Sequence, residues 1–308
     1  MGRYLLRRIL QMIPVVLGTT LLVYALVFAL PGDPVKAMFG DKPVNEAVAA
    51  QIRAEYNLDK PFIVQYLLFL KNALTLDFGK TFSGQLVIDQ IGRAFPVTIK
   101  LALMAFVFEA VFGVIFGAIS GLNKGKWCDT VILIISLLLI SVPTFVTGFL
   151  AQYFLGVKLR LLPVTAGANP GFIDLLMPAM VLGSVSMAYI IRLSRSEISS
   201  NIALDYVRTA RAKGVGERRI LGVHVLRNAS IPIITDVMAT LPALLIGAFL
   251  IERFFGIPGI GREVIIAVER SDFPVIKAIT VYVAAATMIF NLIADLVYKL
   301  VDPRVQLK

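Results

Sequence analysis

The sequence predicts an all-α membrane protein with six transmembrane helices. Of its 308 residues, 58% are hydrophobic and only 16% are charged, whereas soluble domains are nearer half apolar and a quarter charged. The mean hydropathy is +0.83. A helix needs about 20 apolar residues to cross the hydrocarbon core of a bilayer, and six segments of this chain are long enough. We therefore expect a single transmembrane domain over residues 1–308.

The six predicted spans are apolar runs with few charged side chains: residues 9–30, 101–121, 130–157, 172–191, 229–251 and 274–301. The first is too long for the core of a signal peptide, and "LPGDP" follows it instead of a small-residue cleavage site, so we expect a retained helix. The third contains Pro143 and is long enough to tilt or kink there.

The basic residues predict the orientation of these spans. With six crossings both termini lie on one side, and the short segments on that side carry sixteen Lys and Arg residues against six on the other. Positively charged short loops stay in the cytoplasm. Both termini and the loop of residues 192–228 are therefore expected inside, in the cytoplasm.

The long loop of residues 31–95 is expected outside, because loops of this length are translocated regardless of their charge. Within it, "NEAVAAQIRAEYNL" and "FIVQYLLFLKNAL" have apolar residues at helical spacing and are separated by "DKP". This pattern predicts two amphipathic helices on the outer surface.

Several classes of function are excluded by what the sequence lacks. One cysteine, Cys128, and one histidine, His224, exclude an intramolecular disulfide framework and a site of several Cys or His ligands. "GLNKGKW" (Gly121–Trp127) has the wrong spacing for a phosphate-binding Walker loop, and neither His-Glu-x-x-His nor Gly-x-Ser-x-Gly is present. The net charge of +10 comes without a nucleic-acid-binding signature. We expect no catalytic residue, metal site, bound cofactor or nucleic-acid partner, and a packed role for His224.

Two carboxylates inside predicted spans, Glu109 and Asp236, leave an alternative open. Ionisable groups in hydrocarbon are costly and often mark ion or proton routes, so a self-sufficient ion-coupled carrier is conceivable. The simpler interpretation is a carboxyl group that is hydrogen-bonded between helices or faces a water-filled path. Proton relays usually need several such groups, and this sequence has few.

The segment "DYVRTARAKGVGERRI" (Asp205–Ile220) is the most basic part of the chain between two spans. It predicts a short helix that begins with an acidic residue and stops at Gly214, with Gly214 and Gly216 turning the chain. Small residues allow a protein surface to approach closely, and the basic residues supply charge for an acidic rim or for lipid phosphates. The candidate site residues are Asp205, Arg208, Thr209, Ala210, Arg211, Ala212, Lys213, Gly214 and Gly216.

This segment resembles the cytoplasmic signature Glu-Ala-Ala-x3-Gly-x9-Ile-x-Leu-Pro of permease subunits of bacterial ATP-binding cassette (ABC) importers, in the dipeptide/oligopeptide/nickel family. Arg208-Thr209-Ala210 occupy the Glu-Ala-Ala place, Gly214 is the glycine, and His224, Leu226 and Arg227 take the last three places, which departs from the general signature. Further similar motifs, in order, are "LRR" (Leu6–Arg8), "PGDP" (Pro31–Pro34), "LDKPFIVQYL" (Leu58–Leu67), "FGIPGIGR" (Phe255–Arg262), "DFPVI" (Asp272–Ile276) and "DPRV" (Asp302–Val305).

The resemblance implies a type I ABC importer permease in the cytoplasmic (inner) membrane of a bacterium. Its segment Asp205–Gly216 would be the coupling helix that contacts the ATPase. It further implies four partners in a lipid bilayer: a second homologous permease subunit, two cytoplasmic ATPase subunits that bind ATP and Mg, and an extracytoplasmic substrate-binding protein. The substrates of such a system are short peptides, with nickel or glutathione-like molecules as the alternative within the family.

Overall fold

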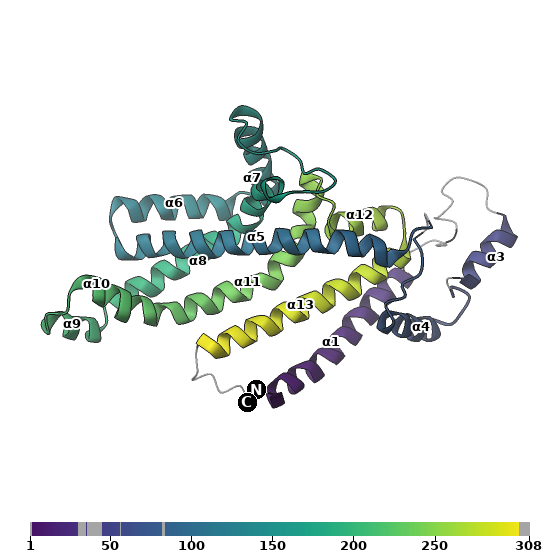
Figure 1. Ribbon diagram of the computed structural model, residues 1–308, viewed down its shortest axis with the longest axis horizontal. Helices are drawn as coiled ribbons and strands as arrows, with labels where there is room; N and C mark the ends of the chain where they lie inside the picture. The colour runs from purple at the N-terminus through teal and green to yellow at the C-terminus, as the bar shows by residue number, and fades with distance from the viewer. Residues whose placement is uncertain (1, 30–34, 36–44, 56, 82–83, 302–308) are drawn as a thin grey trace. The chain divides into compact units, whose positions relative to one another are not determined.

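The structure is a computed structural model that describes residues 2–29, 35, 45–55, 57–81 and 84–301. These residues form two compact units. Unit 1 contains residues 1–98 and 258–289, and unit 2 contains residues 99–257 and 290–308. Within the described residues the elements are helical apart from one antiparallel bridge between Lys80 and Leu86. Figure 1 labels the helices along the chain.

Five helices in the described part of the chain are long and apolar enough to cross a membrane, and a bent pair supplies a sixth if it is counted as one span. This confirms the predicted all-α membrane fold. The spanning helices are α1 (Gly2–Ala29), α5 (Val87–Leu122), the pair α6 (Trp127–Ser141) and α7 (Thr144–Ala151), α8 (Phe172–Ile202), α11 (Leu226–Phe255) and α13 (Phe273–Val301).

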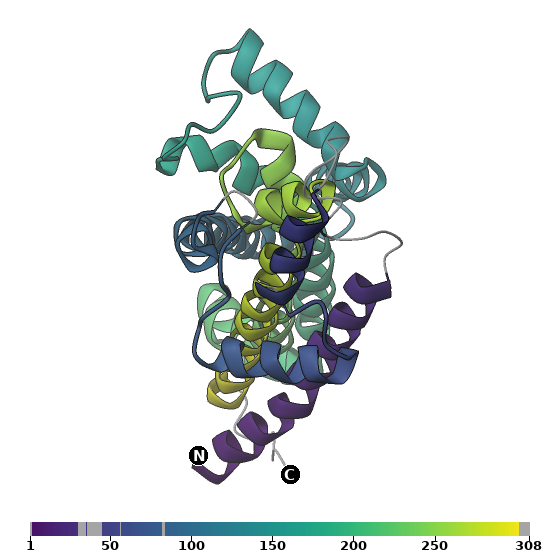
Figure 2. The ribbon, with the colours of Figure 1, turned by 90° about the vertical axis from the view of Figure 1, so that its right-hand side faces the viewer.

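In unit 1 the predicted pair of helices after the first span is present as α3 (Glu46–Glu55) and α4 (Phe62–Leu74). Figure 2 shows α4 lying across the C-terminal half of α1. The Tyr24 hydroxyl donates to Gln65 Oε1 at 3.0 Å, and the two helices share a cluster of aromatic rings around Tyr24. Their position on an outer surface remains a prediction.

Two boundaries differ most from the sequence prediction. Helix α5 begins at Val87, well before the predicted residue 101, so the end of the predicted outer loop is already helical. Helix α8 continues to Ile202, beyond the predicted residue 191. Hydropathy marks the apolar part of a helix, whereas the hydrogen-bonded backbone continues into polar surroundings, and this explains both extensions.

In unit 2 the helices α5 and α8 approach each other very closely at three glycines of α5, four residues apart. A Cβ atom at Gly113 would lie 2.7 Å from Ile190 Cγ2, and one at Gly117 would lie 2.4 Å from Ser194 Cβ. At Gly121 it would lie 3.0 Å from the Arg195 carbonyl oxygen. Small residues let membrane helices pack backbone to backbone, so this part of α5 is fixed against α8.

The third predicted span is broken rather than kinked. Helix α6 ends at Ser141 and α7 starts after Pro143, and the segment that continues as η1 (Gln152–Lys158) makes an angle of 110° with α6. Proline has no backbone N–H and disfavours helical geometry in the residue before it. Val142 accordingly has an extended backbone, and the chain changes direction at this point.

The motifs that carried the family resemblance lie mostly at the ends of helices. "FGIPGIGR" closes α11 with Gly256 in the left-handed region (φ 69°) and opens α12 (Ile260–Glu269). "LDKPFIVQYL" leads into α4, and "DFPVI" begins α13. "PGDP" and "DPRV" lie outside the described residues.

Candidate functional site

The basic segment forms the predicted short helix, α9 (Asp205–Ala212). Lys213 is its C-cap residue, and Gly214 is the residue that follows the cap. Gly214 has φ +73°, and its N–H donates to the Arg211 carbonyl at 2.9 Å while the N–H of Val215 donates to that of Ala210 at 3.1 Å. These two bonds define a Schellman C-cap, which favours glycine at the left-handed position. The predicted glycine stop is therefore confirmed.

The second glycine of the segment has a different role from the one expected. Gly216 has φ −64° and ψ 143°, which any residue can adopt, and it precedes α10 (Glu217–Arg219). The left-handed turn is made at Gly214 alone of the two glycines. From α10 the chain continues through the π-helical segment η2 (Ile220–Val225) into α11.

The inner face of α9 is fixed to the core of unit 2. Val207 is fully buried in a cluster that includes Ile198 of α8 and Val225 of η2, and Ala210 packs against the same cluster. The Tyr206 hydroxyl donates to Asn201 Oδ1 at 3.0 Å, at the end of α8. Helix α9 is thus attached to the core of unit 2 by apolar packing and to the end of α8 by a hydrogen bond.

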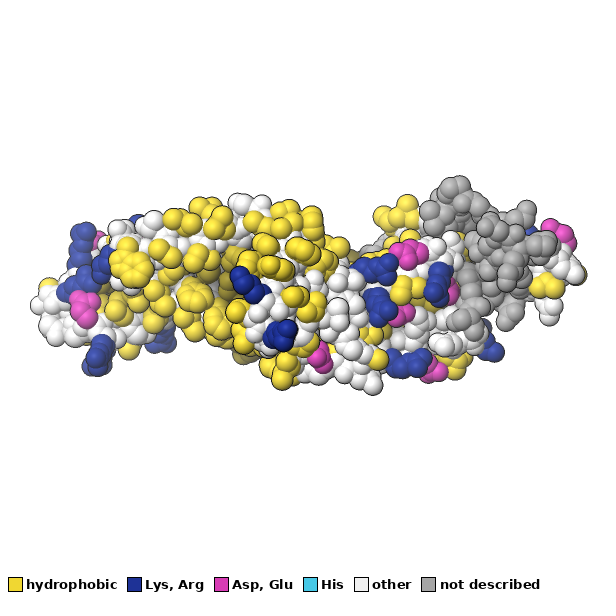
Figure 3. Space-filling model, turned by 90° about the horizontal axis from the view of Figure 1, so that it is seen from above, with side chains coloured by type: hydrophobic (Ala, Val, Ile, Leu, Met, Phe, Trp, Pro, Cys, Tyr) yellow, Lys and Arg dark blue, Asp and Glu magenta, His cyan; other side chains and the backbone are white. Residues whose placement is uncertain are grey.

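The outer face of α9 is exposed and charged, and it consists of Asp205, Arg208, Thr209, Arg211, Ala212 and Lys213. Figure 3 shows Lys and Arg side chains gathered at the end of unit 2 that carries α9 and α10, next to a largely hydrophobic surface. The structure therefore divides the candidate residues: Ala210 supports the helix from inside, whereas the other six lie on the surface.

Arg211 is bound within the chain, which the sequence did not predict. Its Nε donates to Glu217 Oε1 at 2.6 Å and its Nη2 donates to Oε2 at 3.2 Å, across the turn at Gly214. These hydrogen bonds and the charge of Glu217 raise the pKa of the Arg211 guanidinium. Because the pair joins α9 to α10, Arg211 stabilises the turn after α9. Arg208 has only a longer, exposed ion pair with Asp205 at 3.6 Å, so Arg208 and Lys213 are the better candidates for a partner.

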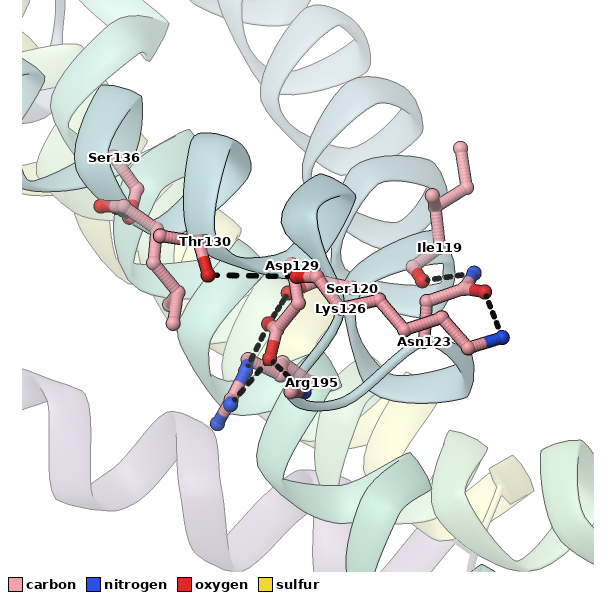
Figure 4. Close-up of polar contacts among 10 residues, drawn as sticks. Ile119, Ser120, Asn123, Lys126, Asp129, Thr130, Ser136 and Arg195 are labelled. Carbon is pink, nitrogen blue, oxygen red and sulfur yellow. Dashed lines mark hydrogen bonds and ion pairs between the residues drawn. The ribbon is translucent and has the colours of Figure 1, made fainter.

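A second site was missed in the sequence, because its two charged residues lie 66 positions apart. Asp129, in the first turn of α6, accepts from Arg195 of α8 through Nε at 2.6 Å and Nη2 at 2.8 Å (Figure 4). The Ser120 hydroxyl and the Gly125 N–H donate to the same carboxylate at 2.5 and 2.8 Å.

This ion pair is largely shielded, because the Asp129 side chain is 3% exposed and that of Arg195 23%. With the glycine contacts, it fixes the α5–α6 hairpin to α8, the helix that leads directly into α9. In the sequence, Asp129 lies between the predicted second and third spans and Arg195 lies in the loop of residues 192–228. An acidic residue within a basic loop is the one signal that the sequence offers.

The two membrane carboxylates do not share one environment. Glu109 is completely buried on α5 and accepts a hydrogen bond from the Thr240 hydroxyl of α11, as the simpler interpretation predicted. Asp236 is exposed on α11. Among the described residues, no group of three His, Cys, Asp or Glu side chains could hold a metal ion.

His224 lies in η2, where its carbonyl oxygen accepts from the Tyr206 hydroxyl at 3.4 Å. This contact involves the backbone, so it does not depend on the imidazole ring. The role of that ring stays a prediction.

Comparison with known proteins agrees with this architecture. Residues 113–307 match the family described as "Binding-protein-dependent transport system inner membrane component", and residues 1–102 match the description "Binding-prot-dependent transport system membrane comp, N-term". The dipeptide transport system permease protein DppB of Bacillus subtilis is 35% identical, over 100% of this chain and 99% of that protein.

Two further relatives cover the chain to the same extent. DppB of Escherichia coli K12 is 32% identical over 100% of both chains. A probable peptide ABC transporter permease protein, y4tP, of Sinorhizobium fredii is 32% identical over 99% of this chain and 100% of its own length.

Proposed function

Because the chain belongs to the family of inner-membrane components of binding-protein-dependent transport systems, we propose that it forms half of the translocation pathway of an ATP-driven importer of short peptides. The names of its relatives support the substrate class, since they are called dipeptide or peptide permeases. Nickel or glutathione-like substrates are the alternative, because in such systems the extracytoplasmic binding protein selects what is delivered.

The proposed assembly contains a second, homologous permease subunit, a substrate-binding protein outside and two ATPase subunits in the cytoplasm. ATP and Mg bind to the ATPase subunits, so this chain is a transport subunit without catalytic residues. One observation supports α9 as the contact with the ATPase. Its outer face is exposed and charged, while its inner face is packed into the core of unit 2.

In the proposed mechanism, closure of the ATPase subunits on ATP moves α9. Val207 and Tyr206 tie α9 to the core and to the end of α8, and the Asp129–Arg195 pair ties α8 to the α5–α6 hairpin. The movement is therefore passed to several helices of unit 2 together. Switching between inward- and outward-open states follows from the displacement of packed helices, which have discrete arrangements.

The alternative, a stand-alone ion-coupled carrier, would be driven by a proton gradient, whereas the proposed importer is driven by ATP. The energy source of uptake therefore tests the proposal. We expect Glu109→Gln and Asp236→Asn complexes to take up peptide when ATP is supplied inside and to be insensitive to collapse of the proton gradient. The physical reason is that Glu109 is hydrogen-bonded to Thr240 in the core, and a relay would need more such groups. The measurement is uptake of a radiolabelled dipeptide into proteoliposomes that contain the whole complex.

The matched control is the same preparation without ATP and with an imposed proton gradient. Accumulation of the dipeptide under that condition, lost in the Glu109→Gln complex, would establish the carrier and refute the ATP-driven importer.

A further inference from the structure

Unit 1 contains a cavity of about 380 Å³. Four parts of the unit form it: the C-terminal half of α1, one face of α4, the bridged segment before α5, and the start of α13. Ligand pockets have volumes of roughly 300–1,000 Å³, so the cavity is large enough for a small molecule. Its lining includes Tyr24, Gln65, Phe69, Asp77, Phe78 and Lys277.

The walls of this cavity are fixed by contacts within the unit. Gln65 is held at both ends of its amide, since it accepts from the Tyr24 hydroxyl and donates to the Lys60 carbonyl at 2.7 Å. The centres of the Tyr24 and Phe69 rings lie 5.4 Å apart, and the centre of the Phe78 ring lies 5.9 Å from that of the Tyr282 ring. A pocket that is already formed binds a ligand with little ordering of its own side chains.

The polar groups of the lining include both signs of charge, and its two cations are Lys80, which is exposed, and Lys277. Lys277 of α13 is partly buried, and its ammonium lies 5.1 Å from the centre of the Tyr24 ring. A cation held in this way against an aromatic wall retains its preference for a carboxylate. Asp77 is exposed, with its Oδ1 accepting from the Gly79 N–H at 3.2 Å. The amides of Asn57 and Asn72 also line the cavity.

We propose that this cavity binds a short peptide as a zwitterion, with its carboxylate at Lys277 and its ammonium at Asp77. The side-chain amides of the lining suit the peptide bond, and the rings of Phe69 and Phe78 suit an apolar side chain. The lining thus supplies a cation, an anion, amides and an aromatic surface. These are complementary to the carboxylate, the ammonium, the peptide bond and an apolar side chain of a free dipeptide. This inference rests on the proposed function, because it names a peptide subsite within the permease itself.

The test is direct binding of radiolabelled Ala-Phe to the whole complex in phosphatidylcholine nanodiscs, without ATP and without binding protein. C-terminally amidated Ala-Phe is expected to bind about tenfold more weakly, because it lacks the anion that pairs with Lys277. In the Lys277→Met complex, the acid and the amide are expected to bind equally. Lys71→Met is the matched control: Lys71 is exposed on the same unit and does not line the cavity.

Asp77→Asn provides an independent arm, since Asn keeps the acceptor for the Gly79 N–H and loses only the charge. It is expected to abolish the discrimination between Ala-Phe and N-acetyl-Ala-Phe. The inference would be overturned if the affinities for Ala-Phe and for its C-terminal amide differed as much in the Lys277→Met complex as in the unaltered complex. In a second set of nanodiscs that also contain phosphatidylglycerol, a Lys277→Met substitution that changes only the retention of this lipid would overturn the inference as well. It would assign Lys277 to lipid.

Failure of this inference is distinguishable from failure of the proposed function. ATP-driven uptake of Ala-Phe by the same complex with its binding protein, combined with unchanged acid–amide discrimination in Lys277→Met, rejects the subsite alone. Absence of ATP-driven uptake of any peptide rejects the proposed function, and the peptide subsite that depends on it.

Discussion

Asp129→Ala is expected to lower the free energy of unfolding by on the order of 3 kcal/mol, because it leaves the partly buried Arg195 charge without its partner. Ser120 and the Gly125 N–H lose their acceptor at the same time. The measurement is thermal unfolding of the purified chain in detergent. The same substitution is expected to reduce peptide transport, since it frees the α5–α6 hairpin from α8.

The control for this prediction is a double-mutant cycle. Arg195→Met alone leaves a buried carboxylate, whereas Asp129→Ala combined with Arg195→Met removes both charges. Replacing both members of a buried ion pair is usually less harmful than removing one. The double variant should therefore be more stable than Asp129→Ala; losses that simply add would show that the two side chains do not interact.

Gly214→Val is expected to insert into the membrane normally and to sustain little transport. A Cβ atom at Gly214 would meet nothing within 4 Å, so the effect comes from the backbone: φ is +73°. A β-branched residue in this region carries strain of about 1–3 kcal/mol. The chain relieves it by changing the turn, which breaks the Schellman cap and moves α9. The measurement is ATP hydrolysis stimulated by the binding protein in the reconstituted complex, which should fall.

Gly216→Val is the matched control, two residues further along the same loop. A Cβ atom there also meets nothing within 4 Å, and φ is −64°. The same side chain is therefore expected to be tolerated, with stimulated hydrolysis close to that of the unaltered complex. Equal damage at both positions would indicate sensitivity of the whole loop to bulk and would contradict the specific role of the turn.

The parts of the fold that could be predicted from the sequence are set by local patterns. Apolar runs predict the spans, helical spacing predicts α3 and α4, and a glycine after a short polar helix predicts the cap at Gly214. Each depends on residues within a few turns of one another. Even the break at Pro143 has a local cause, although its 110° angle depends on what the two helices pack against.

The rest depends on contacts between distant segments. The three glycines of α5 are visible in the sequence at a spacing of four, but their partner α8 is not. Asp129 and Arg195 look like ordinary loop charges until the two helices are brought together. Arg211 looks like an outward-facing charge, and only the geometry of the turn places it on Glu217. The cavity around Lys277 joins segments from both ends of the chain.

The central claim is that the outer face of α9 meets the ATPase, and photo-crosslinking in the assembled complex tests it most directly. A benzophenone amino acid is placed at Arg208, whose side chain is 75% exposed, or at Ala212 on the same exposed face. The control position is Trp127, which is 76% exposed at the start of α6 and is itself aromatic. We expect an adduct with the ATPase subunits from Arg208 and Ala212 and none from Trp127. No adduct from either α9 position, with an ATPase adduct from Trp127, would contradict the claim.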